Sequence, residues 1–266
     1  YAPEIETIHD FDINDYKTKS ELTRTKLYAT VTAAVRAYEQ IRKLDQLAFY
    51  DRLCSLPNRN KFIDLSDERL LSEQYPSDAI AILDIDDFSE SNDALGHQQG
   101  DRLLQAVAER LKQELGGEVI LARLGGDTFG LMGPSGVLDP LTVLDLFRTP
   151  FSVQDDSMVV TATMGLTQEL GAGIAGRDAL KDANIALKLA KKNRRGSFVM
   201  FSAQMGADIR ERVRLLQSLR HAVESERLFV VYQPQVNLTS GKLVGVEALI
   251  RWRNEDGTYV PPDRFI

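Results

Sequence analysis

A short apolar run that ends in acidic residues constrains the fold of this chain more than any other feature. Residues 79–83 read A-I-A-I-L, and residues 84–87, D-I-D-D, follow directly. Five consecutive apolar residues are typical of a central strand that is covered on both faces. Carboxylates next to such a strand cost free energy unless they are paired or bind a cation. The run therefore predicts a buried strand with a polar site at its end.

Helical and strand patterns alternate along most of the remaining chain. The expected helices cover residues 59–74, 101–115, 139–147, 178–192 and 208–224. The expected strands cover residues 119–124, 129–132, 159–166, 197–201, 228–232 and 243–250. The turn G-G-D-T at residues 125–128 joins two of these strands in a hairpin. Interleaved helices and strands predict an α/β (α+β) fold built on one central sheet.

The N-terminal part of the chain predicts a tail and one long helix. Residues 1–16 are polar and acidic and are expected to be a tail or linker remnant, whereas residues 17–49 contain no Gly or Pro. Apolar side chains recur there at spacings of three and four: Leu27, Val31, Ala34, Tyr38, Ile41, Leu44 and Ala48. This seam fits two arrangements, a helix that packs on its own domain or a signalling helix that pairs with a second copy.

The C-terminal part predicts the start of a second domain. Two strands without a covering layer do not make a stable domain, so we expect a further domain to begin near Arg227 and to be cut off. The first residue is Tyr1 rather than Met. We therefore expect the chain to be part of a longer protein, whose missing portion could hold a membrane anchor.

Composition excludes several classes of function. The chain has 32 Lys and Arg against 39 Asp and Glu, a net charge of −7, which disfavours binding to a nucleic-acid backbone. It has one cysteine, so an intrachain disulfide is impossible. No apolar run approaches the roughly 20 residues of a membrane helix. A palm-type polymerase also uses two carboxylates on a sheet, but this chain lacks the basic surface that binding a primer-template requires.

Two carboxylates are the strongest candidates for chemistry. Asp84 ends the apolar strand, and Asp127 lies in the glycine turn that could come beside it. Two converging carboxylates with few histidines nearby suit a hard cation such as Mg²⁺, which usually keeps phosphates as further ligands. Gly125 and Gly126 would let a nucleotide approach the backbone closely. The alternative is structural: Asp84 caps a helix, and the second carboxylate belongs to a tight turn.

Four motifs together give the chain a family resemblance. Residues 51–59 read D-R-L-C-S-L-P-N-R, and residues 84–101 keep most of D-x-D-x-F-K-x-x-N-D-x-x-G-H-x-x-G-D. Residues 123–129 read R-L-G-G-D-T-F, and residues 186–191 read A-L-K-L-A-K. In order and spacing these motifs resemble the GGDEF family, the diguanylate cyclases. The resemblance runs from residue 51 to about residue 201, essentially a whole GGDEF domain.

A second resemblance begins near the end of the chain. Residues 232–234, Y-Q-P, and residues 247–252, E-A-L-I-R-W, are similar to the opening of an EAL domain, the cyclic-di-GMP phosphodiesterase family. That resemblance implies that Glu247 is one ligand of a metal site. The other ligands lie in sequence that this chain does not contain, so the fragment is expected to have no phosphodiesterase activity.

The GGDEF resemblance implies a nucleotidyl-cyclase-like palm, a central mixed sheet flanked by helices and preceded by a long signalling helix. In that family two domains face each other, each with one GTP and metal, and close cyclic-di-GMP with release of pyrophosphate. By position, Asp84, Asp127 and the backbone carbonyl of Ile85 would bind Mg²⁺ (or Mn²⁺). Asn92 and Asp101 would form hydrogen bonds with the guanine edge. Lys191 and Arg195 would bind the terminal phosphates. The turn at Gly125 and Gly126 would lie against the nucleotide.

The departures from the family fall on its chemistry. Thr128 stands where the signature has Glu, and a threonine cannot replace a carboxylate as ligand or proton acceptor. Ser89 replaces a phosphate-facing Lys, which removes a charge that would stabilise the transition state. Lys188 and Arg194 replace a Tyr and a Gly at the phosphate corner. The family's R-x-x-D product-inhibition motif is absent before the signature. Binding groups thus survive better than catalytic ones.

Three hypotheses follow from this pattern. The first is a degenerate GGDEF domain that binds GTP with Mg²⁺ and regulates an adjoining EAL phosphodiesterase. The second is a weak diguanylate cyclase, with water or Asp87 in place of the missing Glu. The third is a dimerisation and relay module without ligand. Along the chain we expect a signalling and dimerisation helix at residues 17–49, a GGDEF domain at 50–203, a linker helix at 204–226 and a truncated EAL start at 227–266. The expected location is cytoplasmic. The expected partners are GTP and/or cyclic-di-GMP, a second copy of the chain through the N-terminal helix, and adjoining sensor and EAL domains, with no nucleic acid.

Overall fold

The computed structural model describes residues 23–266 except residues 73, 76, 155, 169, 171 and 172. The expected tail, residues 1–16, and the first part of the expected long helix lie outside the described residues. The chain divides into two compact units, the first ending at Phe201 and the second spanning Ser202–Ile266. Each unit is described by itself below.

The first unit is built on a five-stranded sheet in the order β2-β3-β1-β6-β7. Its strands are β1 (Asp78–Ile85), β2 (Ile120–Gly125), β3 (Thr128–Pro134), β6 (Ala162–Thr167) and β7 (Phe198–Met200). Neighbours pair antiparallel except β6 and β7, which pair parallel, so the predicted mixed sheet is confirmed. β1 is central and buried at every residue, as its apolar run predicts.

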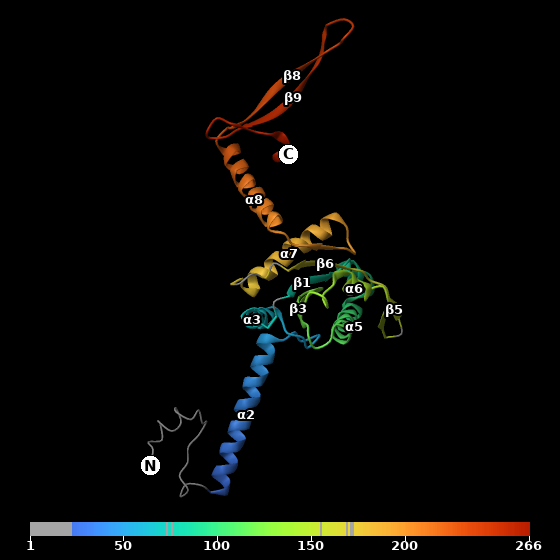
Figure 1. Ribbon diagram of the computed structural model, residues 1–266, viewed down its shortest axis with the longest axis vertical. Helices are drawn as coiled ribbons and strands as arrows, with labels where there is room; N and C mark the ends of the chain where they lie inside the picture. Colours follow the sequence, from blue (N-terminus) through green and yellow to red (C-terminus); the bar gives the residue numbers. More distant parts are fainter. Residues whose placement is uncertain (1–22, 73, 76, 155, 169, 171–172) are drawn as a thin grey trace, which may run out of the picture. The chain divides into compact units, whose positions relative to one another are not determined.

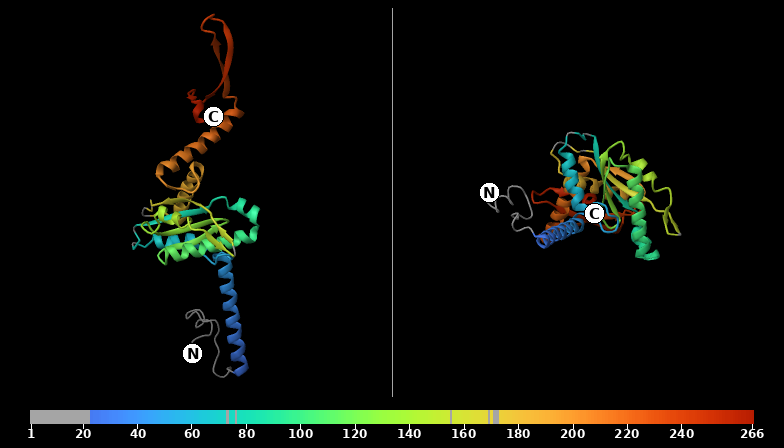
Figure 2. Two further views of the ribbon diagram at one scale, coloured as in Figure 1. Left: turned by 90° about the vertical axis from the view of Figure 1, so that its right-hand side faces the viewer. Right: turned by 90° about the horizontal axis from the view of Figure 1, so that it is seen from below.

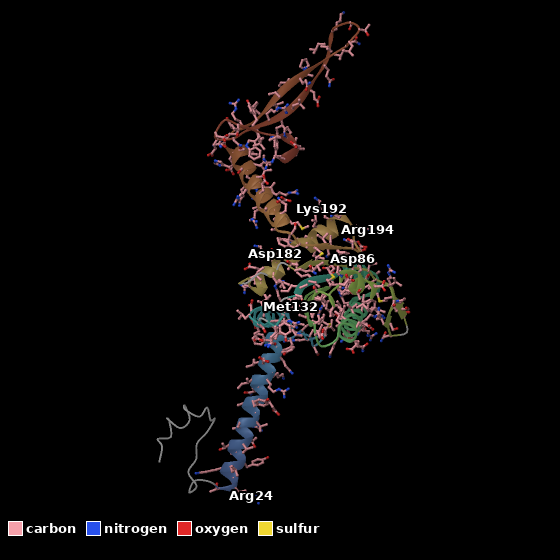
Figure 3. The ribbon with its side chains drawn as sticks, in the orientation of Figure 1. Arg24, Asp86, Met132, Asp182, Lys192 and Arg194 are labelled. Atoms are coloured by element: carbon pink, nitrogen blue, oxygen red, sulfur yellow. The ribbon has the colours of Figure 1, made fainter. Side chains whose placement is uncertain are left out.

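Helices cover both faces of this sheet. α5 (His97–Leu115) and α6 (Pro140–Asp145) pack on one face, and α3 (Arg59–Leu70) and α7 (Gly176–Asn193) pack on the other. Figures 1 and 2 show α5 in green and α3 in cyan on opposite sides of the strands. Alternate residues of β1 enter the two cores, and Met132, labelled in Figure 3, lies in the core beneath α3 and α7.

Several elements differ from the sequence prediction. The helix expected to reach residue 74 ends at Leu70, and the next apolar residue, Leu71, is exposed. α4 (Phe88–Leu95) and the hairpin of β4 (Phe151–Val153) with β5 (Asp156–Met158) were not predicted. Strands of three residues and a helix of eight are too short for a clear periodic pattern.

The long helix α2 (Arg24–Phe49) is capped by Thr23 and has no buried residue. The large apolar side chains of its predicted seam are exposed: Leu27, Val31, Tyr38, Ile41 and Leu44. The structure therefore does not show the seam packed on its own domain. At its C-terminal end, the side-chain amide of Asn58 donates to the carbonyl of Ala48 at 2.7 Å, and its oxygen caps α3. This asparagine joins α2 to the first helix of the domain.

The second unit contains α8 (Ala203–Glu224) and a three-stranded sheet of β8 (Leu228–Val236), β9 (Leu243–Arg253) and β10 (Tyr259–Val260), followed by η1 (Pro262–Arg264). Its core is small and surrounds Trp252. The rings of Trp252 and Phe265 pack edge to face, with their centroids 5.4 Å apart. Most apolar side chains of β8 and β9 are exposed. None of the described helices is long and apolar enough to cross a membrane.

Replacing Gly165 should test how closely α7 packs on β6. A Cβ atom at Gly165 would lie 2.1 Å from the backbone nitrogen of Leu187 and 2.3 Å from the carbonyl of Ala183. We expect Gly165→Ala to lower the free energy of unfolding by about 1–3 kcal/mol or more, because helix backbone cannot move aside cheaply. Urea denaturation measures the effect. Gly117→Ala is the control, since no atom lies within 4 Å of its added Cβ; equal effects for both variants would contradict the packing argument.

Candidate functional site

The two candidate carboxylates lie at the same end of two paired strands. Asp84, near the end of β1, lies opposite Thr128, the first residue of β3. The backbone N–H of Ile85 donates to the carbonyl of Asp127 at 3.2 Å. The chain reaches this position through Gly125 and Gly126, whose φ angles of 136° and 56° favour glycine. The predicted hairpin is confirmed, and it brings Asp127 beside the end of the buried strand.

Asp84 is a buried carboxylate with a partner on each oxygen. Its side chain is 8% exposed, and its Oδ1 pairs with the Nζ of Lys191 at 2.6 Å. Its Oδ2 accepts a hydrogen bond from the hydroxyl of Thr128 at 3.1 Å. The structural alternative, in which Asp84 caps a helix, does not describe these contacts. The residue at the degenerate signature position thus acts as a hydrogen-bond donor to the carboxylate.

The second carboxylate is half-buried and repelled by the first. Burial, followed by the charge of Asp84, raises the pKa of Asp127 above its usual range, and Lys191 and Arg123 offset this only in part. Two carboxylates that repel each other fit a hard divalent cation that would neutralise both, and the role of the Ile85 carbonyl as a further ligand stays a prediction. Within the described residues, no cluster of three or more His, Cys, Asp or Glu side chains surrounds the position.

Asp86 is a buried acidic residue that the sequence motif contains but to which sequence reasoning gave no role. It accepts hydrogen bonds from the hydroxyls of Thr161 at 2.7 Å and Thr163 at 2.6 Å, and from the backbone N–H of Gly196 at 2.9 Å. Asp86 is labelled in Figure 3, as are Lys192 and Arg194 at the end of α7. These contacts fasten β1 to β6 and to the turn after α7.

The turn after α7 carries the predicted phosphate ligand Arg195. Its guanidinium forms a close ion pair with Asp87, which has a left-handed backbone with φ 54°. Asp87, which the second hypothesis puts in place of the signature Glu, thus has a cationic partner in the described structure. Lys188 and Arg194 are exposed. Lys191 and Arg195 are thus both held by carboxylates of the segment that follows the apolar run.

Arg123 connects the glycine turn to the loop that follows α2. Its Nη1 lies 2.9 Å from a carboxylate oxygen of Asp51, and its Nε and Nη2 donate to the carbonyl of Gly126 at 3.0 and 2.6 Å. Asp51 also accepts from the backbone N–H of Cys54. Both ends of this bridge belong to quoted motifs, but their spacing gave no sign that they meet.

Cys54 behaves as the packed thiol that the sequence suggested. Its sulfur lies 3.7 Å from the carbonyl of Leu104. Burial raises its pKa to about 11, so the thiol stays protonated at neutral pH. A protonated thiol is a poor nucleophile and a poor metal ligand.

The predicted guanine-reading residues lie on neighbouring helices. Asn92 is on α4 and Asp101 on α5, with Gly96 between the two helices. The Oδ1 of Asn92 is buried against Gly100 and has no hydrogen-bond partner in the described structure. Asp101 is exposed. Among the described residues, no hydrogen bond or ion pair joins Asn92 or Asp101 to Asp84 or Asp127, so their place in one site stays a prediction.

The remaining predicted positions are exposed. Ser89 lies in the first turn of α4 and is open to solvent. Glu247, the expected metal ligand of the second resemblance, lies on β9 opposite Gln233 and is also exposed. The structure leaves the role of both residues as a prediction.

Removing the charge of Asp127 should stabilise the protein when metal is absent. Its raised pKa means that ionisation disfavours the folded state as the pH rises through that pKa. In EDTA at pH 7 we expect Asp127→Asn to raise the free energy of unfolding by about 0.5–1 kcal/mol, as substitutions at functional sites often do. The gain should shrink as the pH falls through that raised pKa, because the carboxyl becomes protonated. Asp64→Asn, an exposed carboxylate on α3, is the control; a destabilised Asp127→Asn would contradict the repulsion.

Comparisons with known proteins agree with this architecture. The model of the diguanylate cyclase GGDEF domain matches residues 48–197, and the EAL domain model matches residues 216–266. The signaling protein YkoW of Bacillus subtilis is 33% identical over 90% of this chain and 31% of its own length. The bifunctional diguanylate cyclase/cyclic di-GMP phosphodiesterase MucR of Pseudomonas aeruginosa is 32% identical over 91% of this chain and 36% of its own length. The chain thus spans about a third of these relatives.

A solved structure shares the fold of the first unit. The coiled coil and GGDEF domain of DgcB from Caulobacter crescentus, in complex with c-di-GMP, aligns with a TM-score of 0.57 at 25% identity. The alignment covers 66% of this chain and 97% of that one. The chain therefore belongs to the GGDEF family of diguanylate cyclase domains and, with the EAL match that follows, to the GGDEF–EAL proteins of cyclic-di-GMP signalling.

Proposed function

We propose that the GGDEF domain of this chain binds GTP with Mg²⁺ (or Mn²⁺) and regulates an adjoining EAL phosphodiesterase, without working as a diguanylate cyclase. The observation that carries the proposal is the hydrogen bond from the Thr128 hydroxyl to Asp84. At the position where the family has a carboxylate, this chain has a neutral donor. A threonine hydroxyl does not accept a proton near neutral pH, so the site lacks a general base there.

The groups needed for binding are present. Asp84, Asp127 and the Ile85 carbonyl would hold the metal, which when bound neutralises phosphate charge. Lys191 and Arg195 supply positive charge for terminal phosphates from the end of α7 and the turn after it. The exposed carboxylate of Asp101 offers an acceptor for donors on the guanine edge, and Asn92 lies on the neighbouring helix.

Regulation would pass between domains that are adjacent in the chain. We propose a GGDEF domain over residues 50–203, a linker helix over residues 204–226 and the start of an EAL domain over residues 227–266. β7 ends at Met200 and α8 begins at Ala203, so only two residues separate the sheet of the first unit from the helix of the second. NbdA and PdeR, relatives with 31% identity, are named as cyclic di-GMP phosphodiesterases, which supports an EAL activity in the whole protein.

Nucleotide binding and turnover test the proposal together. With Mg²⁺, we expect calorimetry to show saturable binding of GTP at physiological levels, tighter than ATP. Chromatography of the same mixture should show no cyclic-di-GMP above a control without protein. Asp101→Asn should weaken GTP roughly tenfold through lost hydrogen bonds to a charged group. Glu109→Gln, on the same helix and also exposed, should bind GTP as the unaltered protein does.

Each contrary result points to another hypothesis. Product above the control, raised further by Thr128→Glu, would identify a weak cyclase and reject the proposal. No GTP binding with Mg²⁺ would leave a relay module without ligand.

We also propose that α2 forms a homodimer through its exposed seam. A row of exposed apolar side chains at spacings of three and four is typical of a helix that pairs with another helix. We expect Ile41→Asp to shift the protein toward monomer, because it places a charge in the seam. Light scattering over a range of concentrations measures the shift. Gln40→Asp adds the same charge beside the seam and should leave the association unchanged; equal loss for both variants would contradict pairing through this face.

A further inference from the structure

Lys191 forms an ion pair with Asp84, the carboxylate that the family pattern assigns to the metal. Its ammonium lies 2.6 Å from the Oδ1 of Asp84, whose side chain is 8% exposed. The other oxygen of Asp84 accepts from Thr128 at 3.1 Å. Both oxygens of the carboxylate are therefore engaged by the protein itself, one by a full positive charge.

A divalent cation that reaches Asp84 competes with this ammonium. The two cations neutralise the same carboxylate and repel each other, and the repulsion is strong in a partly buried site. The ammonium of Lys191 is able to move, since it lies at the end of a flexible four-carbon chain and the side chain is 36% exposed. The cost of binding a free metal ion thus includes breaking the ion pair between Lys191 and Asp84.

A triphosphate changes this balance. Terminal phosphates offer Lys191 another anion, so a nucleotide that draws the ammonium away leaves Asp84 to the metal. We propose that Lys191 is a specificity-determining residue that makes the site select the complex of a divalent cation with a nucleoside triphosphate over the free cation. The inference deepens the proposed function and depends on it for the nucleotide. By linkage, metal and triphosphate then each raise the affinity of the other by the same factor.

Thr128 strengthens this selection. Asp84, Asp127 and Lys191 carry a formal net charge of −1, whereas a Glu at position 128 would make it −2. A site with the smaller negative charge attracts a free divalent cation less. The hydroxyl also donates to the Oδ2 of Asp84, while Lys191 pairs with Oδ1.

Mn²⁺ binding tests the competition without nucleotide. Electron paramagnetic resonance of free Mn²⁺ would be followed while protein is added, for the unaltered chain and for Lys191→Met. We expect Lys191→Met to bind Mn²⁺ alone about fivefold more tightly or better, in the usual range of coupling between sites. Lys192→Met removes the same charge from an exposed neighbour and should match the unaltered chain. Lys191→Arg keeps the charge and should also keep the weak affinity.

The second measurement uses a fluorescent, non-hydrolysable GTP analogue in the presence of Mn²⁺. Lys191→Met should bind it at least fivefold more weakly, because the phosphates lose a cation. The same variant would then have a higher affinity for the metal alone and a lower affinity for the metal–nucleotide complex. A purely structural role of Lys191 would weaken both, and that result would overturn the inference.

The two proposals fail in different ways. If the unaltered chain binds the analogue but Lys191→Met leaves the affinity for Mn²⁺ unchanged, the competition is rejected and the proposed function stands. If the unaltered chain binds Mn²⁺ and no analogue, the proposed function is rejected, and the selectivity assigned to Lys191 is rejected with it.

Discussion

The carboxylate of Asp84 is a buried charge, and the surrounding structure must supply partners that offset the cost of its burial. β1 lies in the centre of the sheet and is covered on both faces, so a carboxylate near its end cannot be solvated freely. The sheet order places β3 beside it, which brings the hydroxyl of Thr128, and α7 covers it, which brings Lys191. The packing that builds the core therefore also fixes the partners of the site.

The same constraint explains the polar contacts around it. Asp86 is buried and takes three hydrogen bonds, two from threonine hydroxyls of the β6 side and one from the turn after α7. Arg123 joins the loop after α2 to the carbonyl of Gly126 through Asp51. Buried polar networks of this kind are rigid when every member has a partner. Physical contacts thus run from the loop after α2 to the turn that carries Asp127.

The sequence predicted the parts of this arrangement that local patterns encode. The run at residues 79–83 predicted the central strand, and the glycine turn predicted the hairpin that brings Asp127 to it. It did not predict the pairing of Lys191 with Asp84, or of Asp86 with Thr163, because these residues meet only through the packing of α7 and β6 on β1. Likewise, the hairpin of β4 and β5 has strands too short for an alternating pattern. The motifs identified the candidate residues, and the tertiary packing determines which of them are in contact.

The substitution at position 128 therefore has two consequences that belong together. A Glu there would add a negative charge to a pair of carboxylates that already repel each other. Thr128 removes that charge and donates to Asp84 instead. The absence of a proton acceptor at position 128 and the smaller negative charge of the site thus come from one side chain. Under the proposed function, such a site would bind a metal–triphosphate complex without turning it over, and its occupancy would follow the concentration of that complex.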